Sequence, residues 1–419
     1  MNSFALKTSC KKWLRAAWPL AFLLAAGLAA SADTLAPAGD PAGSESKVYQ
    51  DGRTWVQEIT GSLPAPREIK VITEAGSVKV HGAAQSNLTY ILRKRVKAGS
   101  EEEARRLFSN FRIQAWSQGQ IALFRGEFSN SYGRRSASVD FDIATPRSTA
   151  AVMAETGGGS VAVNTISGTV AVQTGGGSIQ LDEVGGAATA SSGGGTIELG
   201  NMGSDVSVET GGGSIRIKSA GGSVAATSGG GSIEVISARR AVSVETGGGS
   251  IRVQECGKEL KMSSGGGSLE VGKAGGAVIA ETGGGSIRVV SAQGLVRADS
   301  GGGSIHLTGL TRGVQVETGA GGIIVEFAGG ASLTDSMLET SSGDVTVSLP
   351  ANVGVTIRGA IESGSKGSVH SDFGELRVVS DSDQWGPHEV LVEGKVNGGG
   401  PVLKIRTATG NIVLLRAKK

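Results

Sequence analysis

Apolar and polar residues alternate on both sides of a glycine triplet, and this pattern returns throughout the middle of the chain. Residues 206–217 read Val-Ser-Val-Glu-Thr-Gly-Gly-Gly-Ser-Ile-Arg-Ile. Because side chains of a strand point alternately to opposite faces, the alternation predicts two short strands joined by the glycines. The residues expected to face inward are Val206, Val208, Ile215 and Ile217, and those expected to face outward are Ser207, Glu209 and Arg216.

The triplet recurs every 18 residues. Gly-Gly-Gly begins at residues 157, 175, 193, 211, 229, 247, 265, 283 and 301, and a degenerate Gly-Ala-Gly-Gly begins at 319. Two apolar columns keep the same phase, one from Val152 to Val314 and the other from Val161 to Ile323. Rungs stacked about 4.8 Å apart would bury these columns in one core, about 50 Å long for ten rungs. The predicted fold class is therefore all-β, a parallel β-solenoid of about ten 18-residue rungs over residues 151–328.

An antiparallel meander with glycine hairpins would also satisfy the alternation, and charged residues discriminate between the two arrangements. One outward column changes sign at every rung, through Glu198, Arg216, Glu234, Arg252, Glu270 and Arg288. If residue i stacks on residue i+18, opposite charges become neighbours, which stabilises by a few tenths to about 1 kcal/mol per pair. The meander gives no such pairing, so this structural charge ladder favours the parallel solenoid.

The small residues of each rung have a structural and a functional interpretation. We expect the glycines to turn the chain sharply with positive φ, and the alternative is a flat strip where a ligand reaches the backbone. The hydroxyl column from Thr156 to Thr246 and the one from Ser160 to Ser250 are expected to bond to each other or to turn backbone. Cys256 shares its column with alanines, which predicts a buried, unreactive thiol.

The segments that flank the repeat divide the rest of the chain. Residues 1–32 have a basic start, an apolar run and an Ala-Ser-Ala site, which predicts a signal peptide; the run is short for an uncleaved membrane anchor. Residues 33–47 are expected to be a disordered linker. Residues 48–150 are expected to form a β-rich N-terminal cap, with a short helix opened by a capping box of Ser100 and Glu103. Residues 329–419 are expected to form divergent C-terminal rungs and a cap.

Composition narrows the function classes. The formal charge is +2, but the predicted signal peptide holds four basic residues and no acidic one, so the mature chain is close to neutral. No basic patch indicates a nucleic-acid partner. The histidines lack metal-ligand spacing, and Ser or Thr follows each in-phase triplet where calcium-binding repeats have Asp, so we expect no metal and no cofactor. Most carboxylates recur with the repeat, which indicates a solvated face and not catalysis, so we expect no enzyme.

The order of motifs resembles a family of exported bacterial proteins, a domain of unknown function named as an adhesin by inference. The similarity covers residues 55–419. Its carriers are the Gly-Ser-Val-Lys-Val segment at Gly76, the insert with the helix, Ile-Ala-Thr-Pro ending at Pro146, the Thr-x-x-Gly-(Ser/Asp)-(Ile/Val) rungs, and Val-Ser-Leu-Pro ending at Pro350 before a closing rung. The resemblance implies an extracytoplasmic β-solenoid, periplasmic, on the cell surface or secreted.

Three functions remain open from the sequence. The first is an adhesin or envelope-associated module that binds a glycan or protein, with candidate binding residues in an acidic column beside the glycines: Glu209, Glu245, Glu281 and Glu317. The second is a structural or assembly spacer of the cell envelope. The third, and weakest, is a polysaccharide-active β-helix enzyme. The mature chain is expected to have no integral membrane span.

Overall fold

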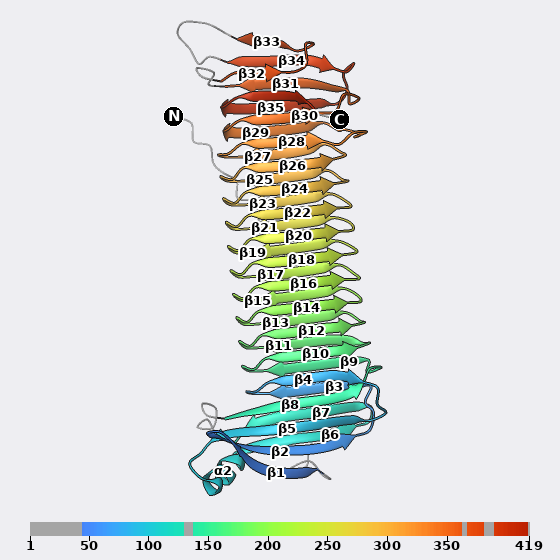
Figure 1. Cartoon of the computed structure of the whole chain (residues 1–419), viewed down its shortest axis with the longest axis vertical. Coiled ribbons are helices and arrows are strands. Elements are labelled where there is room, and N and C mark those ends of the chain that lie inside the picture. Colours follow the sequence, from blue (N-terminus) through green and yellow to red (C-terminus); the bar gives the residue numbers. More distant parts are fainter. Residues whose placement is uncertain (1–43, 130–136, 363–366, 381–388, 418–419) are drawn as a thin grey trace.

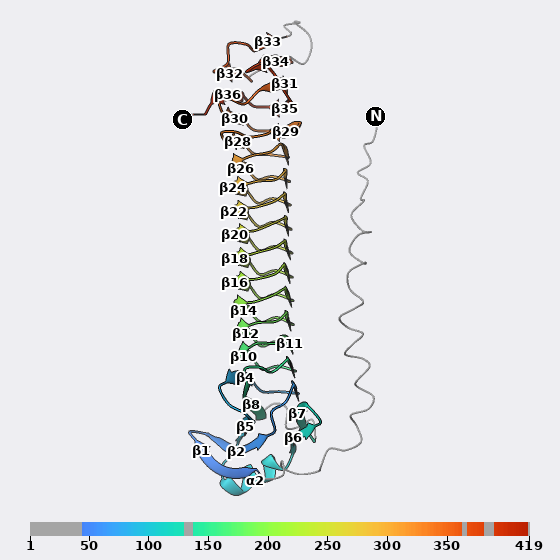
Figure 2. The ribbon, with the colours of Figure 1, turned by 90° about the vertical axis from the view of Figure 1, so that its right-hand side faces the viewer.

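The computed structural model describes residues 44–129, 137–362, 367–380 and 389–417. It is a tall stack of β-strands (Figure 1) in which two sheets face each other across a thin core (Figure 2). We call them sheet A and sheet B, and each rung of the repeat contributes one strand to each sheet. The expected signal peptide, residues 1–32, lies outside the described residues. Within the described part of the chain no helix is long and apolar enough to span a membrane.

The repeat strands pair in parallel with residue i beside residue i+18. Ile215 pairs with Ile233 in sheet A, and Val206 pairs with Val224 in sheet B. The parallel arrangement is confirmed, and the meander is excluded. The sheet A strands are β10 (Val161–Ile166), β12 (Ile179–Val184), β14 (Ile197–Met202), β16 (Ile215–Ala220), β18 (Ile233–Ala238), β20 (Ile251–Cys256), β22 (Leu269–Ala274), β24 (Ile287–Ala292), β26 (Ile305–Leu310) and β28 (Ile323–Phe327). The sheet B strands are β9 (Ala151–Thr156), β11 (Thr169–Thr174), β13 (Ala188–Ser192), β15 (Val206–Thr210), β17 (Val224–Ser228), β19 (Val242–Thr246), β21 (Leu260–Ser264), β23 (Val278–Thr282), β25 (Val296–Ser300) and β27 (Val314–Thr318).

The core between the sheets is built from aliphatic side chains. The four inward residues expected from residues 206–217 are all buried, and the three expected to face outward are exposed. Each such aliphatic side chain stabilises by about 1.5–3 kcal/mol when it leaves water. Among the described residues, buried aromatic rings lie only toward the two ends, for example Phe124 and Phe141 before the repeat and Phe373 after it.

The expectation that the triplets turn with positive φ is wrong. Ten described glycines have positive φ, and none of them belongs to the nine in-phase triplets. The first and third glycines are required instead by close approach: a Cβ on Gly175 or Gly177 would overlap the backbone of the rung before. The middle glycine, Gly176, has no atom within 4 Å of that position. The turns of successive rungs therefore stack too tightly for side chains at two of the three positions.

The first hydroxyl column closes these turns. Thr174 Oγ1 accepts from the Gly177 N–H at 3.1 Å and donates to the Gly159 carbonyl in the rung before at 2.8 Å. The same pair of bonds recurs in later rungs, for example at Ser192. Its structural role is confirmed, since the hydroxyls are buried and bonded to turn backbone. The second hydroxyl column, at Ser160 and Ser178, is exposed.

The N-terminal region continues the stack with antiparallel strands and with two parallel strands, β3 (Glu68–Thr73) and β4 (Val78–Ala83), next to the repeat. In sheet A the order is β1 (Glu45–Asp51), β2 (Thr54–Leu63), β5 (Leu88–Lys97), β8 (Ala137–Pro146) and β4, and β4 pairs with β10. In sheet B, β6 (Phe111–Gln118), β7 (Ile121–Phe128) and β3 lead to β9. Because β1 begins at Glu45, the last residues of the expected 33–47 linker are strand; the residues up to 43 lie outside the described chain.

One helix, α2 (Glu101–Phe108), lies at this end (Figure 1). The capping prediction is confirmed in part, because Ser100 Oγ accepts from the Glu103 N–H at 3.2 Å. The Glu103 carboxylate, however, accepts from the Gly99 N–H at 2.8 Å. Phe108 and Phe111 are buried as expected.

The C-terminal region adds strands out of chain order. They are β29 (Ser336–Ser342), β30 (Val345–Leu349), β31 (Val355–Ile361), β32 (Val369–Ser371), β33 (Arg377–Ser380), β34 (Val390–Val396), β35 (Val402–Thr409) and β36 (Ile412–Arg416). The last two strands stack directly on β29 and β30, with Thr340 beside Thr407 and Val345 beside Ile412. The chain therefore runs to the far end and returns to insert its closing rung.

Candidate binding face

The outer face of sheet B carries two columns of side chains in strict register. We call the first the small-residue column, although its ends are larger: Met153, Ala171, Thr189, Ser207, Ala225, Ser243, Lys261, Ile279, Arg297 and Gln315. We call the second the acidic column: Glu155, Gln173, Ser191, Glu209, Thr227, Glu245, Ser263, Glu281, Asp299, Glu317 and Glu339. Both columns point outward because they alternate with the buried residues of each strand.

The four carboxylates predicted from the sequence lie in this acidic column. Glu209, Glu245 and Glu317 are exposed, and Glu281 is half-buried. Thr227 separates the first two in register, so carboxylates alternate with hydroxyls in this part of the face.

Sequence reasoning missed members of the column that change its character. Asp299 and Glu339 complete a run of four carboxylates in successive rungs, from Glu281 through Glu317 to Glu339. Asp299 stands 18 residues after Glu281, so counting by the repeat could have found it. Glu339 lies 22 residues after Glu317, where the repeat has changed its length, so its place follows from the Glu-Thr pair that both strands share and not from the 18-residue spacing. Like charges across strands oppose each other, so the fold gains nothing from this run.

A shallow trough runs along the small-residue column, which separates it from the acidic column. It has a volume of about 880 Å³ and extends from Ala187 to Ile279, along the residues that precede and begin the sheet B strands. A second depression of about 360 Å³ begins at Met153 and shares Thr189, Ser207 and Ala225 with the first.

The trough exists because the small-residue column holds only Ala, Thr or Ser over five rungs, from Ala171 to Ser243. Larger side chains bound it, with Met153 at one end and Lys261 and Ile279 at the other. This feature was missed from the sequence, although the change from small to large at residue 261 was visible there.

The outer face of sheet A is different, because its charges are arranged in opposite pairs. The charge ladder is in register as predicted, with Arg216 between Glu198 and Glu234. Arg216 forms an ion pair with Glu234 at 3.0 Å, and Arg252 forms one with Glu270 at 2.8 Å. Among the described residues, Glu198 and Arg288 at the ends of the ladder take part in no ion pair. Neither do the sheet B carboxylates from Glu209 to Glu317. Sheet A therefore neutralises part of its charge internally, whereas sheet B leaves its carboxylates to solvent.

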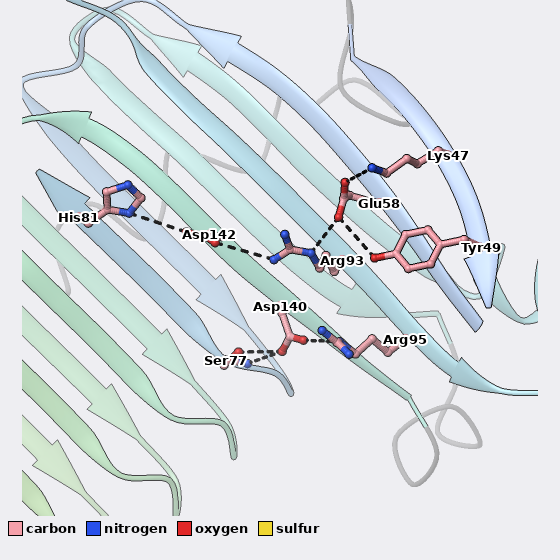
Figure 3. A network of polar contacts seen from close by, with 9 residues as sticks. All are labelled: Lys47, Tyr49, Glu58, Ser77, His81, Arg93, Arg95, Asp140 and Asp142. Atoms are coloured by element: carbon pink, nitrogen blue, oxygen red, sulfur yellow. Dashed lines mark hydrogen bonds and ion pairs between the residues drawn. The ribbon is translucent and has the colours of Figure 1, made fainter. Parts of the chain in front are cut away.

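A denser polar network lies on the outer face of the N-terminal cap (Figure 3). Glu58 on β2 accepts from Arg93 Nε on β5 at 2.9 Å and lies 2.8 Å from Lys47 Nζ on the edge strand β1. Arg93 also lies 3.7 Å from Asp142 on β8, whose other oxygen lies 3.7 Å from His81 Nδ1. The network thus joins four antiparallel strands and the first parallel strand.

The ion pairs of this network hold the strands of the cap together, and we call the network the clamp. The hydrogen bond from Lys47, together with Arg93, holds the pKa of Glu58 below its ordinary value, so this carboxylate stays ionised and paired at neutral pH. Asp140 accepts from Ser77 Oγ at 2.8 Å and from Arg95 Nε at 2.8 Å. The same carboxylate oxygen of Asp140 accepts from the Ser77 backbone N–H at 2.9 Å, so these bonds fasten Ser77 to β8.

Metal ligands do not gather in the part of the chain that the structure covers, where no three His, Cys, Asp or Glu side chains could hold an ion together. Cys256 is buried, and burial raises the pKa of its thiol. The predicted inward corner is confirmed, since Ala238 and Ala274 beside it are also buried.

Comparison with known proteins adds little. No family model matches the chain, and no curated protein matches it. The chain is similar to the crystal structure of a "putative cell adhesion protein" from Clostridium sporogenes ATCC 15579, with 10% sequence identity and a TM-score of 0.17. The match covers 86% of this chain and 100% of that one. At this TM-score the similarity carries no argument, and function has to be inferred from the faces of the solenoid.

Proposed function

We propose that the chain is an exported, non-catalytic β-solenoid that acts as an adhesin or envelope-associated binding module. Its binding surface is the outer face of sheet B, and its partner is a component of the envelope or of the extracellular surroundings. One observation carries the proposal: five small side chains from Ala171 to Ser243 leave a trough on the outer face of sheet B, next to an acidic column whose carboxylates from Glu209 to Glu317 form no ion pair among the described residues.

The repetition of the rungs explains why such a face could bind an extended partner. Successive rungs present similar groups about every 4.8 Å along one straight face, so an extended partner can make many equivalent contacts. Each exposed contact is weak, but contacts made by one continuous partner add through high effective concentration. Folding does not require the trough, because the inward columns and the turns already define the rungs.

The test is retention of the mature chain on whole cells or isolated envelopes, with the trough open or blocked. Ala225→Tyr fills the middle of the trough with an exposed side chain and leaves the core untouched. Gln315→Tyr is the matched control, since it adds the same ring to the same column beyond the trough. We expect Ala225→Tyr to reduce retention severalfold and Gln315→Tyr to leave it unchanged. Equal retention of all three proteins would show that the trough is not the contact surface.

A spacer or assembly role is the second candidate, and one feature of the C-terminal end favours it. Val378 and Val379 on the edge strand β33 are 49% and 45% exposed, beside Leu391, which is 40% exposed. Exposed apolar edge strands pair with other strands. This role predicts concentration-dependent polymers in sedimentation velocity that Val379→Lys abolishes. A monomer at all concentrations would exclude end-to-end assembly.

A further inference from the structure

The spacing of the acidic column points to a particular kind of partner. Glu209, Glu245 and Glu281 occur at every second rung, with Thr227 and Ser263 between them in register. Two rungs span about 9.6 Å, so the face offers a carboxylate at that interval and a hydroxyl midway.

An extended polypeptide in the polyproline II conformation matches this interval. It has three residues per turn and rises about 3.1 Å per residue, so every third side chain recurs after about 9.3 Å on the same side. A β-strand repeats every two residues, about 6.6–6.8 Å, and falls out of step with the carboxylates at once. The two outward columns are two residues apart along each strand, about 6.6 Å. An α-helix, about 10–12 Å wide, is wider than this separation. The shallow trough therefore suits a thin extended chain lying along the solenoid axis.

Charge and hydrogen bonding complete the match. The carboxylates from Glu209 to Glu281 form no ion pair among the described residues, so they are available to cationic side chains. The backbone of a polyproline II segment has no internal hydrogen bonds, which leaves its carbonyls free to accept from hydroxyls such as Thr227 and Ser263. The small side chains of Ser207 and Ala225 provide room for the rest of the chain beside the acidic column.

We infer that the partner of this face is an extended, cationic polypeptide with a Lys or Arg at every third residue, running along the solenoid axis. This inference rests on the proposed function and names the chemical class of its partner. It predicts that register, and not total charge alone, determines affinity.

The test compares two synthetic peptides of equal composition, measured by fluorescence anisotropy against the mature chain. One repeats Pro-Pro-Lys, and the other holds the same lysines grouped at one end. We expect the regular peptide to bind about tenfold more tightly, because it can pair several carboxylates at once. Glu245→Gln should weaken the regular peptide about fivefold, the upper range for an exposed ion pair. Glu255→Gln, which removes an exposed carboxylate from sheet A, is the matched control and should change nothing.

The outcomes separate this inference from the proposed function. Equal affinity for the two peptides, or an equal loss in Glu245→Gln and Glu255→Gln, would overturn the register argument. Binding of cationic amino-sugar oligomers but of neither peptide would assign the face to a glycan and overturn the inference as well. In each of these cases the adhesin proposal stands if the wild-type chain is still retained on envelopes. Absence of retention on any surface would overturn the adhesin proposal itself.

Discussion

The three glycines of one rung look equivalent in the sequence but occupy different environments, and this difference can be tested directly. A Cβ on Gly247 would overlap the carbonyl of Gly229, and a Cβ on Gly249 would overlap the backbone of Gly231. A Cβ on Gly248 would point into open space, with no atom within 4 Å. Three alanine substitutions in one turn therefore form a matched set in which only the local approach of the neighbouring rung differs.

The expected magnitudes follow from the bonds at this turn. The overlapping atoms belong to backbone, so the rungs must move apart to admit a methyl group at the first or third position. The Gly249 N–H donates to Thr246 Oγ1 at 3.3 Å, and Thr246 Oγ1 donates to the Gly231 carbonyl at 2.8 Å. Weakening these two bonds and the adjoining ladder bond, at about 1 kcal/mol each, gives a loss of about 2–3 kcal/mol. Gly248→Ala should instead stabilise by about 0.4–1 kcal/mol, because alanine restricts the unfolded chain.

Urea denaturation of the parent chain and the three variants measures the effect, provided that the slopes of the transitions agree. Hydrogen exchange should place the loss in the rungs on either side of the substituted turn, since solenoid repeats contact mainly their neighbours. If Gly248→Ala destabilises as much as Gly249→Ala, close approach is not the reason for the triplet, and a backbone conformation that alanine resists must be sought.

Three further predictions use other parts of the molecule. Arg252→Glu removes the ion pair with Glu270 and puts three carboxylates in successive rungs. Because the pair is exposed, the free energy of unfolding should fall by less than about 1 kcal/mol at low salt and recover at high salt, and no change at low salt would count against the ladder. Cys256 should react with a thiol reagent far more slowly in the native protein than in denaturant, since it is buried with a raised pKa; equal rates would show an open corner. The hydrogen bond from Lys47 lowers the pKa of Glu58 from 4.5, so its stabilisation is present above about pH 4.5 and is lost as the pH falls through the lowered pKa. Glu58→Gln should flatten that part of the pH profile of the urea midpoint, and an unchanged profile would refute the clamp.

The architecture could be predicted from the sequence because two independent periods, the alternation of apolar and polar residues and the 18-residue repeat, agree. Alternation fixes which residues face the core, and the 18-residue repeat with its sign-changing charges fixes which strand lies beside which. The repeat alone, for example, places Arg216 between two glutamates, where it lies. The closing strands β35 and β36 could not be placed in this way. Their echo of the repeat was visible, but a sequence carries no sign that the chain returns to insert between earlier strands.

The glycine error has a physical cause. Glycine serves both for left-handed backbone and for close packing, and composition does not distinguish these uses. Only the neighbouring rung decides, since Gly177 is restricted by the backbone beneath it. Only part of the candidate face was predicted, for a similar reason. The repeat located the acidic column, but the trough depends on the size of the side chains in the adjacent column.

The contrast between the two outer faces carries the functional argument further. Both faces belong to the same rungs, and the strands of both sheets cover the same core, so folding imposes nearly the same demands on each. Sheet A uses this freedom to pair opposite charges, as in Arg252 and Glu270. Sheet B places Glu281, Asp299 and Glu317 in successive rungs, which opposes folding without any compensating contact among the described residues. A cationic partner would remove that repulsion, and solvent ions compete with it for the same carboxylates. Attachment through sheet B should therefore weaken steadily as salt rises, whereas attachment through exposed apolar strands at the C-terminal end should strengthen or stay constant.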